Sequence, residues 1–219
     1  MLDGVVPPLL IVAAGGLLAG FRRFYLQGRT EKNGGVSDVA IVITILSLAM
    51  TLEYEMGRTP TYRHGPVRLW SGDINSDQNS QQIFDPYSFT HVIHGAALYG
   101  LARVVLGAAS FGATAIAVVT FEAAWEVYEN TNQVINQYRA ETVSLGYEGD
   151  SMINSCFDIV CCMVGLLIAW RRPAWMTVSW VVVVEIILAL WIRDNLTFNV
   201  IMLIHPVKAI KAWQMGVGT

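Results

Sequence analysis

Charged side chains are scarce in this sequence. Lys, Arg, Asp and Glu make up 14% of its 219 residues, whereas soluble domains carry roughly 25%. The chain is also 54% hydrophobic, with a mean hydropathy of +0.47, and several apolar runs approach the roughly 20 residues that cross a bilayer. This composition excludes an ordinary soluble domain and predicts an all-α, polytopic bundle of membrane-spanning helices.

Basic residues and cysteines are also few. The 14 Lys and Arg residues are outnumbered by 17 Asp and Glu residues, and the net charge is −3. No basic stripe with interleaved aromatic side chains appears, so a nucleic-acid partner is not expected. The three cysteines, Cys156, Cys161 and Cys162, fall in one apolar run and form no Cys-x-x-Cys pair, which indicates packing residues within a membrane helix.

The first apolar run lacks the basic segment that precedes the core of a secretory signal peptide. Asp3 comes before this run, and Arg22 and Arg23 come after it. The run is therefore interpreted as the first membrane helix.

The whole chain, 1–219, is interpreted as one integral membrane domain. Six apolar stretches are long enough to span the membrane, at residues 5–21, 37–56, 88–108, 112–130, 151–170 and 174–192. Residues 57–86 are too polar to cross lipid, and because a loop of this length often covers a site, we expect an outer cap. Residues 196–205 form an apolar run of ten, which is too short to cross alone, so a re-entrant or interfacial segment is expected.

Positive charge in the short connections predicts the orientation, because short cytoplasmic loops of membrane proteins are enriched in Lys and Arg. The first and fifth connections hold such clusters: Arg22, Arg23, Arg29 and Lys32 in the first, and Arg171 and Arg172 in the fifth. The N-terminus and the two long polar segments, 57–86 and 131–150, are therefore expected on the outer side.

Acids and histidines interrupt three of the apolar stretches, although a charged side chain at the bilayer centre costs at least about 2.5–3.5 kcal/mol. On a helix, side chains three, four or seven residues apart share one face. Three such sets occur: His91 and His94; Glu122, Glu126 and Glu129; and Asp150, Asn154 and Asp158. The predicted topology puts all three at the outer ends of their helices, so we predict that they meet in one outward-facing pocket.

A metal site is the first interpretation of this pocket. Two imidazoles and several carboxylates from neighbouring helices suit a divalent Zn, Fe or Mn ion, which could activate water for hydrolysis. The expected ligands are His91, His94, Glu122, Glu126 and Asp158.

Metal-free acid–base chemistry is a second interpretation, since a buried carboxylate beside a histidine can move protons. With or without a metal, the catalytic candidates are Glu122, Glu126, Asp158 and His94. The candidates for substrate binding are Arg139, Asp150, Asn154 and Arg193, because arginines bind anionic head groups or phosphate. The expected function is hydrolysis or transfer on a lipid or cell-envelope substrate.

A structural role is the third interpretation. The buried acids would pair with Arg193, His91 or Asn154 to lock the bundle or to dock a partner subunit. Glu185, in the middle of the sixth stretch, would pair across the bundle or face such a partner. The chain would then be a non-catalytic accessory or structural subunit of a larger membrane complex, with membrane lipids as its other neighbours. Movement of ions or protons through the pocket also stays open.

Glycines within the apolar stretches are expected to let helices approach closely. The ones that we expect to do so are Gly95, Gly100 and Gly165. The remaining histidines, His64 and His205, are expected to be loop or interface residues rather than ligands.

Several short stretches carry a resemblance to a known family: residues 67–70 (Val-Arg-Leu-Trp), 79–81, 88–95, 122–126, 129–130, 138–140, 149–151, 154–155, 158 and 192–197. With them the chain resembles the UPF0314 (DUF2585) family of bacterial integral membrane proteins of unassigned function. The order His, Glu and Asp on consecutive helices is also similar to VanZ-type membrane proteins. Together with the charge distribution, the resemblance implies a multi-pass protein of the bacterial inner membrane with a periplasmic N-terminus.

Overall fold

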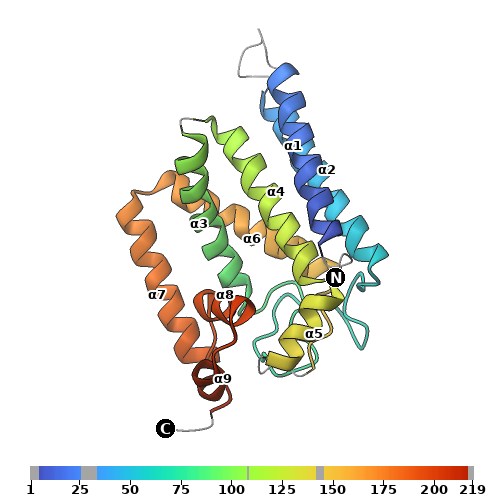
Figure 1. The fold of residues 1–219 in the computed structure, drawn as a ribbon, viewed down its shortest axis with the longest axis vertical. Helices are drawn as coiled ribbons and strands as arrows, with labels where there is room; N and C mark the ends of the chain where they lie inside the picture. Colours follow the sequence, from blue (N-terminus) through green and yellow to red (C-terminus); the bar gives the residue numbers. More distant parts are fainter. Residues whose placement is uncertain (1–4, 26–33, 108, 142–145, 217–219) are drawn as a thin grey trace.

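The computed structural model describes residues 5–25, 34–107, 109–141 and 146–216, which form nine helices and no strand. Figure 1 shows an all-α bundle, as predicted. The helices are α1 (Val6–Tyr25), α2 (Gly34–Glu55), α3 (Ser88–Leu106), α4 (Phe111–Glu129), α5 (Asn132–Glu141), α6 (Met152–Arg171), α7 (Ala174–Ile192), α8 (Leu196–Ile204) and α9 (Lys208–Gln214). Two of the charges used for the orientation, Arg29 and Lys32, lie outside the described residues.

Six long helices build the bundle. Five of them, α1, α2, α3, α6 and α7, are long and apolar enough to cross a membrane. The sixth, α4, has the same 19-residue length as α3 and α7 and packs against α1, α2, α3 and α6. Its only charged residues are three glutamates. The predicted stretches overlap all six helices, and the largest difference in a boundary is at the end of α1.

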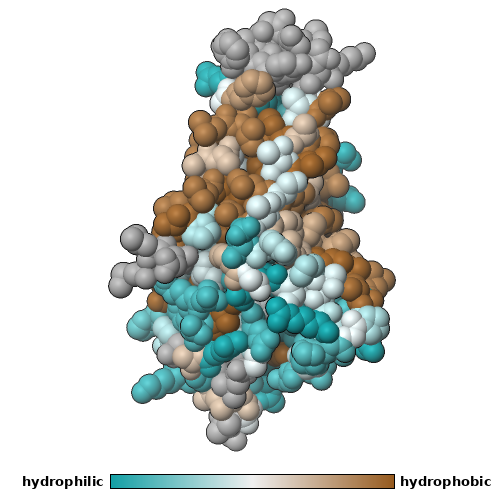
Figure 2. All heavy atoms as spheres, turned by 90° about the vertical axis from the view of Figure 1, so that its right-hand side faces the viewer, coloured by the Kyte–Doolittle hydropathy of each residue, from teal (hydrophilic) through white to brown (hydrophobic). Residues whose placement is uncertain are grey.

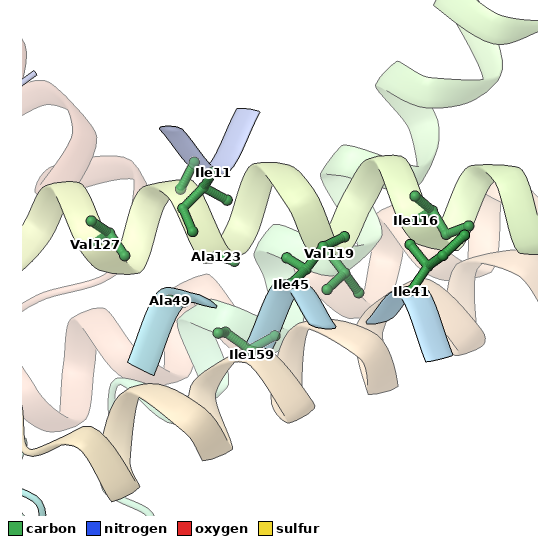
Figure 3. Close-up of a cluster of buried hydrophobic side chains, with 10 residues drawn as sticks. Ile11, Ile41, Ile45, Ala49, Ile116, Val119, Ala123, Val127 and Ile159 are labelled. Carbon is green, nitrogen blue, oxygen red and sulfur yellow. The ribbon is translucent and has the colours of Figure 1, made fainter. Parts of the chain in front are cut away.

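Helix α4 lies at the centre of the bundle, and two of its faces are buried. Ile116, Val119, Ala123 and Val127 pack with side chains of α1, α2 and α6 in one apolar cluster, and Figure 3 shows this contact. Val118 instead packs against Cys162 and Leu166 of α6. Since lipid is as apolar as these side chains, close packing rather than the hydrophobic effect favours these helix contacts.

Reciprocal glycines bring α3 and α6 together. A Cβ atom added at Gly95 would lie 1.8 Å from the carbonyl oxygen of Cys162, and one at Gly165 would lie 1.8 Å from the carbonyl oxygen of Val92. The prediction of close helix contact is thus confirmed at both positions. It is wrong for Gly100, where an added Cβ would meet no described atom within 4 Å.

The long polar segments lie at one end of the bundle, where Figure 1 shows the 57–86 cap beside α5, α8 and α9. Arg58 of the cap donates to the carbonyl of Glu148 (2.7 Å), and Gln81 donates to the carbonyl of Gly149 (2.7 Å). Figure 2 shows a hydrophobic surface above and a hydrophilic surface at this end. The polar connection after α4 is not a simple loop, because its first part forms α5.

The C-terminal segment turns back rather than crossing. Arg193 adopts a left-handed conformation with φ 55°, and the carboxylate of Glu185 accepts hydrogen bonds from the backbone N–H groups of Leu196 (3.0 Å) and Thr197 (3.1 Å). Glu185 therefore caps the start of α8, where helix N–H groups lack partners. The other end of α8 stays at the capped side, because Gln137 of α5 donates to the carbonyl of Leu203 (2.6 Å).

Candidate functional site

One buried imidazole faces carboxylates from two other helices. The Nδ1 atom of His91 lies 2.7 Å from Glu122 Oε1 and 3.1 Å from Glu126 Oε1. On the other side of the ring, Nε2 lies 3.9 Å from Asp158 Oδ2. The three faces predicted from α3, α4 and α6 therefore meet at His91. We call His91, His94, Glu122, Glu126 and Asp158 the His/Glu/Asp centre.

Local contacts hold these side chains in place. The Gly95–Gly165 crossing lies one turn from His91 on α3 and about two turns from Asp158 on α6, so it draws the two helices together beside the centre. At the start of α3, the Ser88 hydroxyl donates to Asp158 Oδ1 (2.9 Å). On α6, Ser151 caps the first turn by accepting from the N–H of Asn154 (3.3 Å). The centre is thus built on helix ends that are fixed relative to one another.

His94 forms the second imidazole of the centre. Its Nδ1 atom lies 3.3 Å from Glu122 Oε2, although only the longer contact to Oε1, at 3.4 Å, has hydrogen-bond geometry. The ring packs edge-on against Trp125, with centroids 5.4 Å apart. Ligand atoms of His91, His94 and Glu122 lie within 4.8 Å of one another, and so do those of His91, Glu126 and Glu129.

The centre holds more acids than bases. Glu122 and Glu126 are fully buried. Within the described part of the chain, Glu122 Oε2 and both oxygens of Glu126 have no hydrogen-bond partner. Burying a charged oxygen without a partner is unfavourable by several kcal/mol. A cation or added protons would remove this cost, and the mixed imidazole and carboxylate donors fit Zn, Fe or Mn.

A small cavity of about 50 Å³ adjoins the centre and is lined by His91, His94 and Asp158 together with Glu129, Asp150 and Asp194. It is large enough for an ion or a water molecule. The centre therefore opens onto a space in which a small reactant could be held.

Three tyrosines donate hydrogen bonds to acids in the wall of this small cavity. The pairs are Tyr138 with Glu129 (3.0 Å), Tyr147 with Asp150 (2.9 Å) and Tyr87 with Asp194 (3.1 Å). Burial raises the pKa of all three phenols, so they remain neutral donors. Burial also raises the pKa of the Asp194 carboxyl to about 6, although hydrogen bonds from Asn195, Tyr87 and Gln214 oppose this shift.

The predicted substrate-binding residues do not all reach this cavity. Asp150 lines the small cavity and also a larger cavity under the cap. Arg139 lines only the larger cavity. Asn154 is buried but lines neither cavity, and no partner for its Nδ2 is found among the described residues. Arg193 lies in a separate groove beside α9 and donates to the carbonyl of Trp213 (3.3 Å). The interpretation that pairs Arg193 with the buried acids therefore has no support in the geometry.

Glu53 is a buried acid that the sequence reasoning missed. It is fully buried on α2, and neither of its carboxylate oxygens has a partner in the described residues. A signal was available, because Ile41, Ile45, Ala49 and Glu53 follow one another at intervals of four and all four are buried. This spacing puts Glu53 on the face of α2 that points into the bundle.

Comparison with known proteins places the chain in a family. A family model described as a protein of unknown function (DUF2585) matches residues 53–216. The chain belongs to this family, UPF0314 (DUF2585). A UPF0314 protein of Rhizobium meliloti (strain 1021) is 43% identical over 173 residues, which cover 79% of this chain and 88% of that protein. A UPF0314 protein of Sphingopyxis alaskensis is 40% identical over 185 residues, which cover 84% and 98%. No solved structure matches the chain.

Proposed function

We propose that this UPF0314 chain is a multi-pass protein of the bacterial inner membrane whose His/Glu/Asp centre binds a divalent cation. The centre acts on a lipid or cell-envelope substrate by hydrolysis or transfer, and the capped end faces the periplasm. The apolar helices and the bacterial relatives support a membrane protein. The observation that carries the metal is the position of His91 beside Glu122, Glu126 and Asp158. Among the described residues, three buried oxygens of Glu122 and Glu126 have no hydrogen-bond partner.

The side chains of the centre would hold the ion and also supply a base. His91, His94, Glu122, Glu126 and Asp158 supply the donors, and a bound ion would lower the pKa of a water molecule and polarise the substrate. A carboxylate oxygen that does not contact the ion takes the proton of the attacking water. In hydrolysis the hydroxyl of that water would form a bond to the phosphorus or acyl carbon while the bond from that atom to the leaving oxygen breaks. The proton would then pass from the carboxylate to the leaving oxygen.

Metal analysis of the protein purified in detergent tests the centre. We expect about one equivalent of Zn, Fe or Mn in the wild type and loss of the metal in His91→Ala and His94→Ala. His205→Ala is the matched control, because this exposed histidine lies outside the centre. A wild type without stoichiometric metal, or full metal content in both centre variants, would contradict the proposal that the centre binds a metal ion.

Mass spectrometry of lipids tests the reaction. The protein is incubated with total lipid from a bacterium that encodes a relative, and products are compared with those from a Glu122→Gln, Asp158→Asn double variant. We expect lipid products from the wild type alone. A metal-loaded wild type that changes no lipid would instead favour the accessory or structural subunit, with other membrane subunits as its partners.

A further inference from the structure

A large polar cavity lies under the cap, beside the His/Glu/Asp centre. Residues of the 57–86 segment, of α5 and of the 146–150 strip enclose about 800 Å³. Pockets for small molecules measure roughly 300–1,000 Å³, so this cavity has room for a molecule rather than a bare ion. It lies at the hydrophilic end of the bundle, where the membrane helices end (Figures 1 and 2).

Three arginines, Arg58, Arg63 and Arg139, line this cavity. Arg58 is fixed, because its Nη1 donates to the Glu148 carbonyl (2.7 Å) and its Nη2 to Asn132 Oδ1 (3.0 Å). Its Nε is buried and has no partner among the described residues. Arg139 donates through Nε to the carbonyl of Tyr147, and Arg63 is exposed. Arginine binds phosphate through a planar fork of donors, so three of them in one wall favour an anion.

Three acids, Asp77, Glu148 and Asp150, line the same cavity. Asp77 accepts a hydrogen bond from the Tyr62 hydroxyl (2.8 Å). Asp150 accepts from the Tyr147 hydroxyl (2.9 Å) and from Asn130 Nδ2 (3.0 Å). Glu148 is exposed, and among the described residues none of these three carboxylates forms an ion pair with a guanidinium group.

The cavity under the cap shares a wall with the small cavity at the centre. Asn79, Tyr147 and Asp150 line both spaces, and the small cavity also contacts His91 and His94. A ligand held by the arginines would thus lie next to the centre.

We propose that the cavity under the cap binds the phosphate-bearing head group of a lipid through Arg139 and Arg63, with Arg58 as a fixed part of the wall. A soluble phosphate ester offers the same chemistry, but the position at the helix ends favours a head group that remains attached to the membrane. This inference rests on the proposed function only for its last step, in which the bound phosphate is presented to the centre.

Binding of short-chain lipids to the full chain in a phosphate-free maltoside detergent tests the proposal. The probes are dihexanoylphosphatidylglycerol, its neutral counterpart dihexanoylglycerol, and glycerol 3-phosphate, and affinity is measured by isothermal titration calorimetry. We expect the phospholipid to bind most tightly, and Arg139→Ala and Arg63→Ala each to weaken its binding by tenfold or more. Arg68→Ala is the control, because Arg68 lies in the same loop but does not line the cavity.

Several outcomes would overturn the inference. Equal binding of dihexanoylglycerol would remove the role of phosphate, and equal binding of glycerol 3-phosphate would assign the site to a soluble ester. Arg63→Ala removes an exposed side chain that is not needed for folding. Unchanged affinity in this variant would exclude the proposed binding of phosphate by the arginines. No binding of any probe would reject the site.

The metal measurement separates this inference from the proposed function. A wild type that binds the phospholipid but holds no metal would defeat the proposed function alone. A metal-loaded wild type that does not bind the phospholipid would defeat the head-group site alone. His94→Ala should lose the metal while it keeps its affinity for the phospholipid.

Discussion

The two ends of the bundle carry ionic groups that differ in their balance of charge. At the end without the cap, Arg22 of α1 pairs with Asp38 of α2 (Nη2–Oδ2, 3.0 Å) and donates to Ser110 (3.3 Å) at the start of α4. At the capped end, two imidazoles face three carboxylates in the His/Glu/Asp centre. Among the described residues, the first group pairs one arginine with one aspartate, whereas carboxylates outnumber imidazoles in the second.

The difference indicates separate purposes for the two groups. A matched pair with two hydrogen bonds satisfies its own charges and can join three helices without any further component. Unpaired buried carboxylates raise the free energy of the folded state unless a proton or cation joins them. The Arg22–Asp38 pair is therefore complete without any further component, whereas the centre needs added protons or a cation to balance its charge.

Removal of the buried imidazole should have the largest effect. His91→Leu leaves Glu122, Glu126 and Asp158 without their shared partner, so we expect the free energy of unfolding to fall by about 3–5 kcal/mol. Thermal unfolding in detergent, with His205→Leu as the control, measures the difference. Equal stability of the two variants would show that His91 contributes no more to the free energy of unfolding than the exposed His205.

Asp194 is an intermediate case, because this buried carboxylate has hydrogen-bond donors but no cationic partner within the described part of the chain. Burial raises its pKa to about 6 in the folded state, above the unfolded value of about 3.9. The folded state thus holds a proton that the unfolded state has released between these values, so stability falls as the pH rises through this window. The full loss is about 3 kcal/mol.

Comparison of wild type and Asp194→Asn isolates this contribution. The variant cannot titrate at this position, so its unfolding free energy should fall less than that of the wild type between pH 4 and pH 7. Parallel pH profiles for the two proteins would refute the raised pKa of Asp194.

The smallest effect concerns a glycine beside the Arg22–Asp38 pair. A Cβ at Gly112 would lie 1.8 Å from Asp38 Oδ2 and 3.0 Å from Arg22 Nη2, whereas one at Gly100 would meet no described atom within 4 Å. Alanine in a helix interior is favoured over glycine by roughly 0.5–1 kcal/mol. We expect Gly100→Ala to gain this amount and Gly112→Ala to lose about 1 kcal/mol, because the pair must shift. Equal melting temperatures would show that the pair adapts freely.

Much of the fold was predictable from local sequence. The six apolar stretches correspond to helices because a helix satisfies its backbone hydrogen bonds within its own segment, as lipid requires. Helix α5 was not predicted, because residues 132–141 are mostly polar and too few to cross a membrane. A signal was available, since Val134, Ile135 and Tyr138 share one helix face and are buried. The cap of α8 by Glu185 was also missed, since it depends on a chain reversal at Arg193 rather than on neighbouring residues.

The site was predictable in part. The spacing of Glu122 and Glu126 and the shared depth of the three polar sets indicated that His91, His94 and Asp158 would approach them. Glu53 was overlooked, because near the end of a helix an acid is expected to reach water. Arg193 follows the sixth span as expected, but the turn at this residue directs its side chain toward α9.

The sequence by itself determined that the chain has helices apolar enough to cross a membrane, where the six long helices lie, and that acids and histidines occur within them. Hydropathy and helical period are properties of consecutive residues. Only the tertiary structure decided that His91 stands between carboxylates of α4 and α6, and that two cavities adjoin there. Those features depend on how closely α3 and α6 approach and on the rotation of each helix about its axis. Contacts between residues far apart in the chain, such as Gly95 with Cys162, set both.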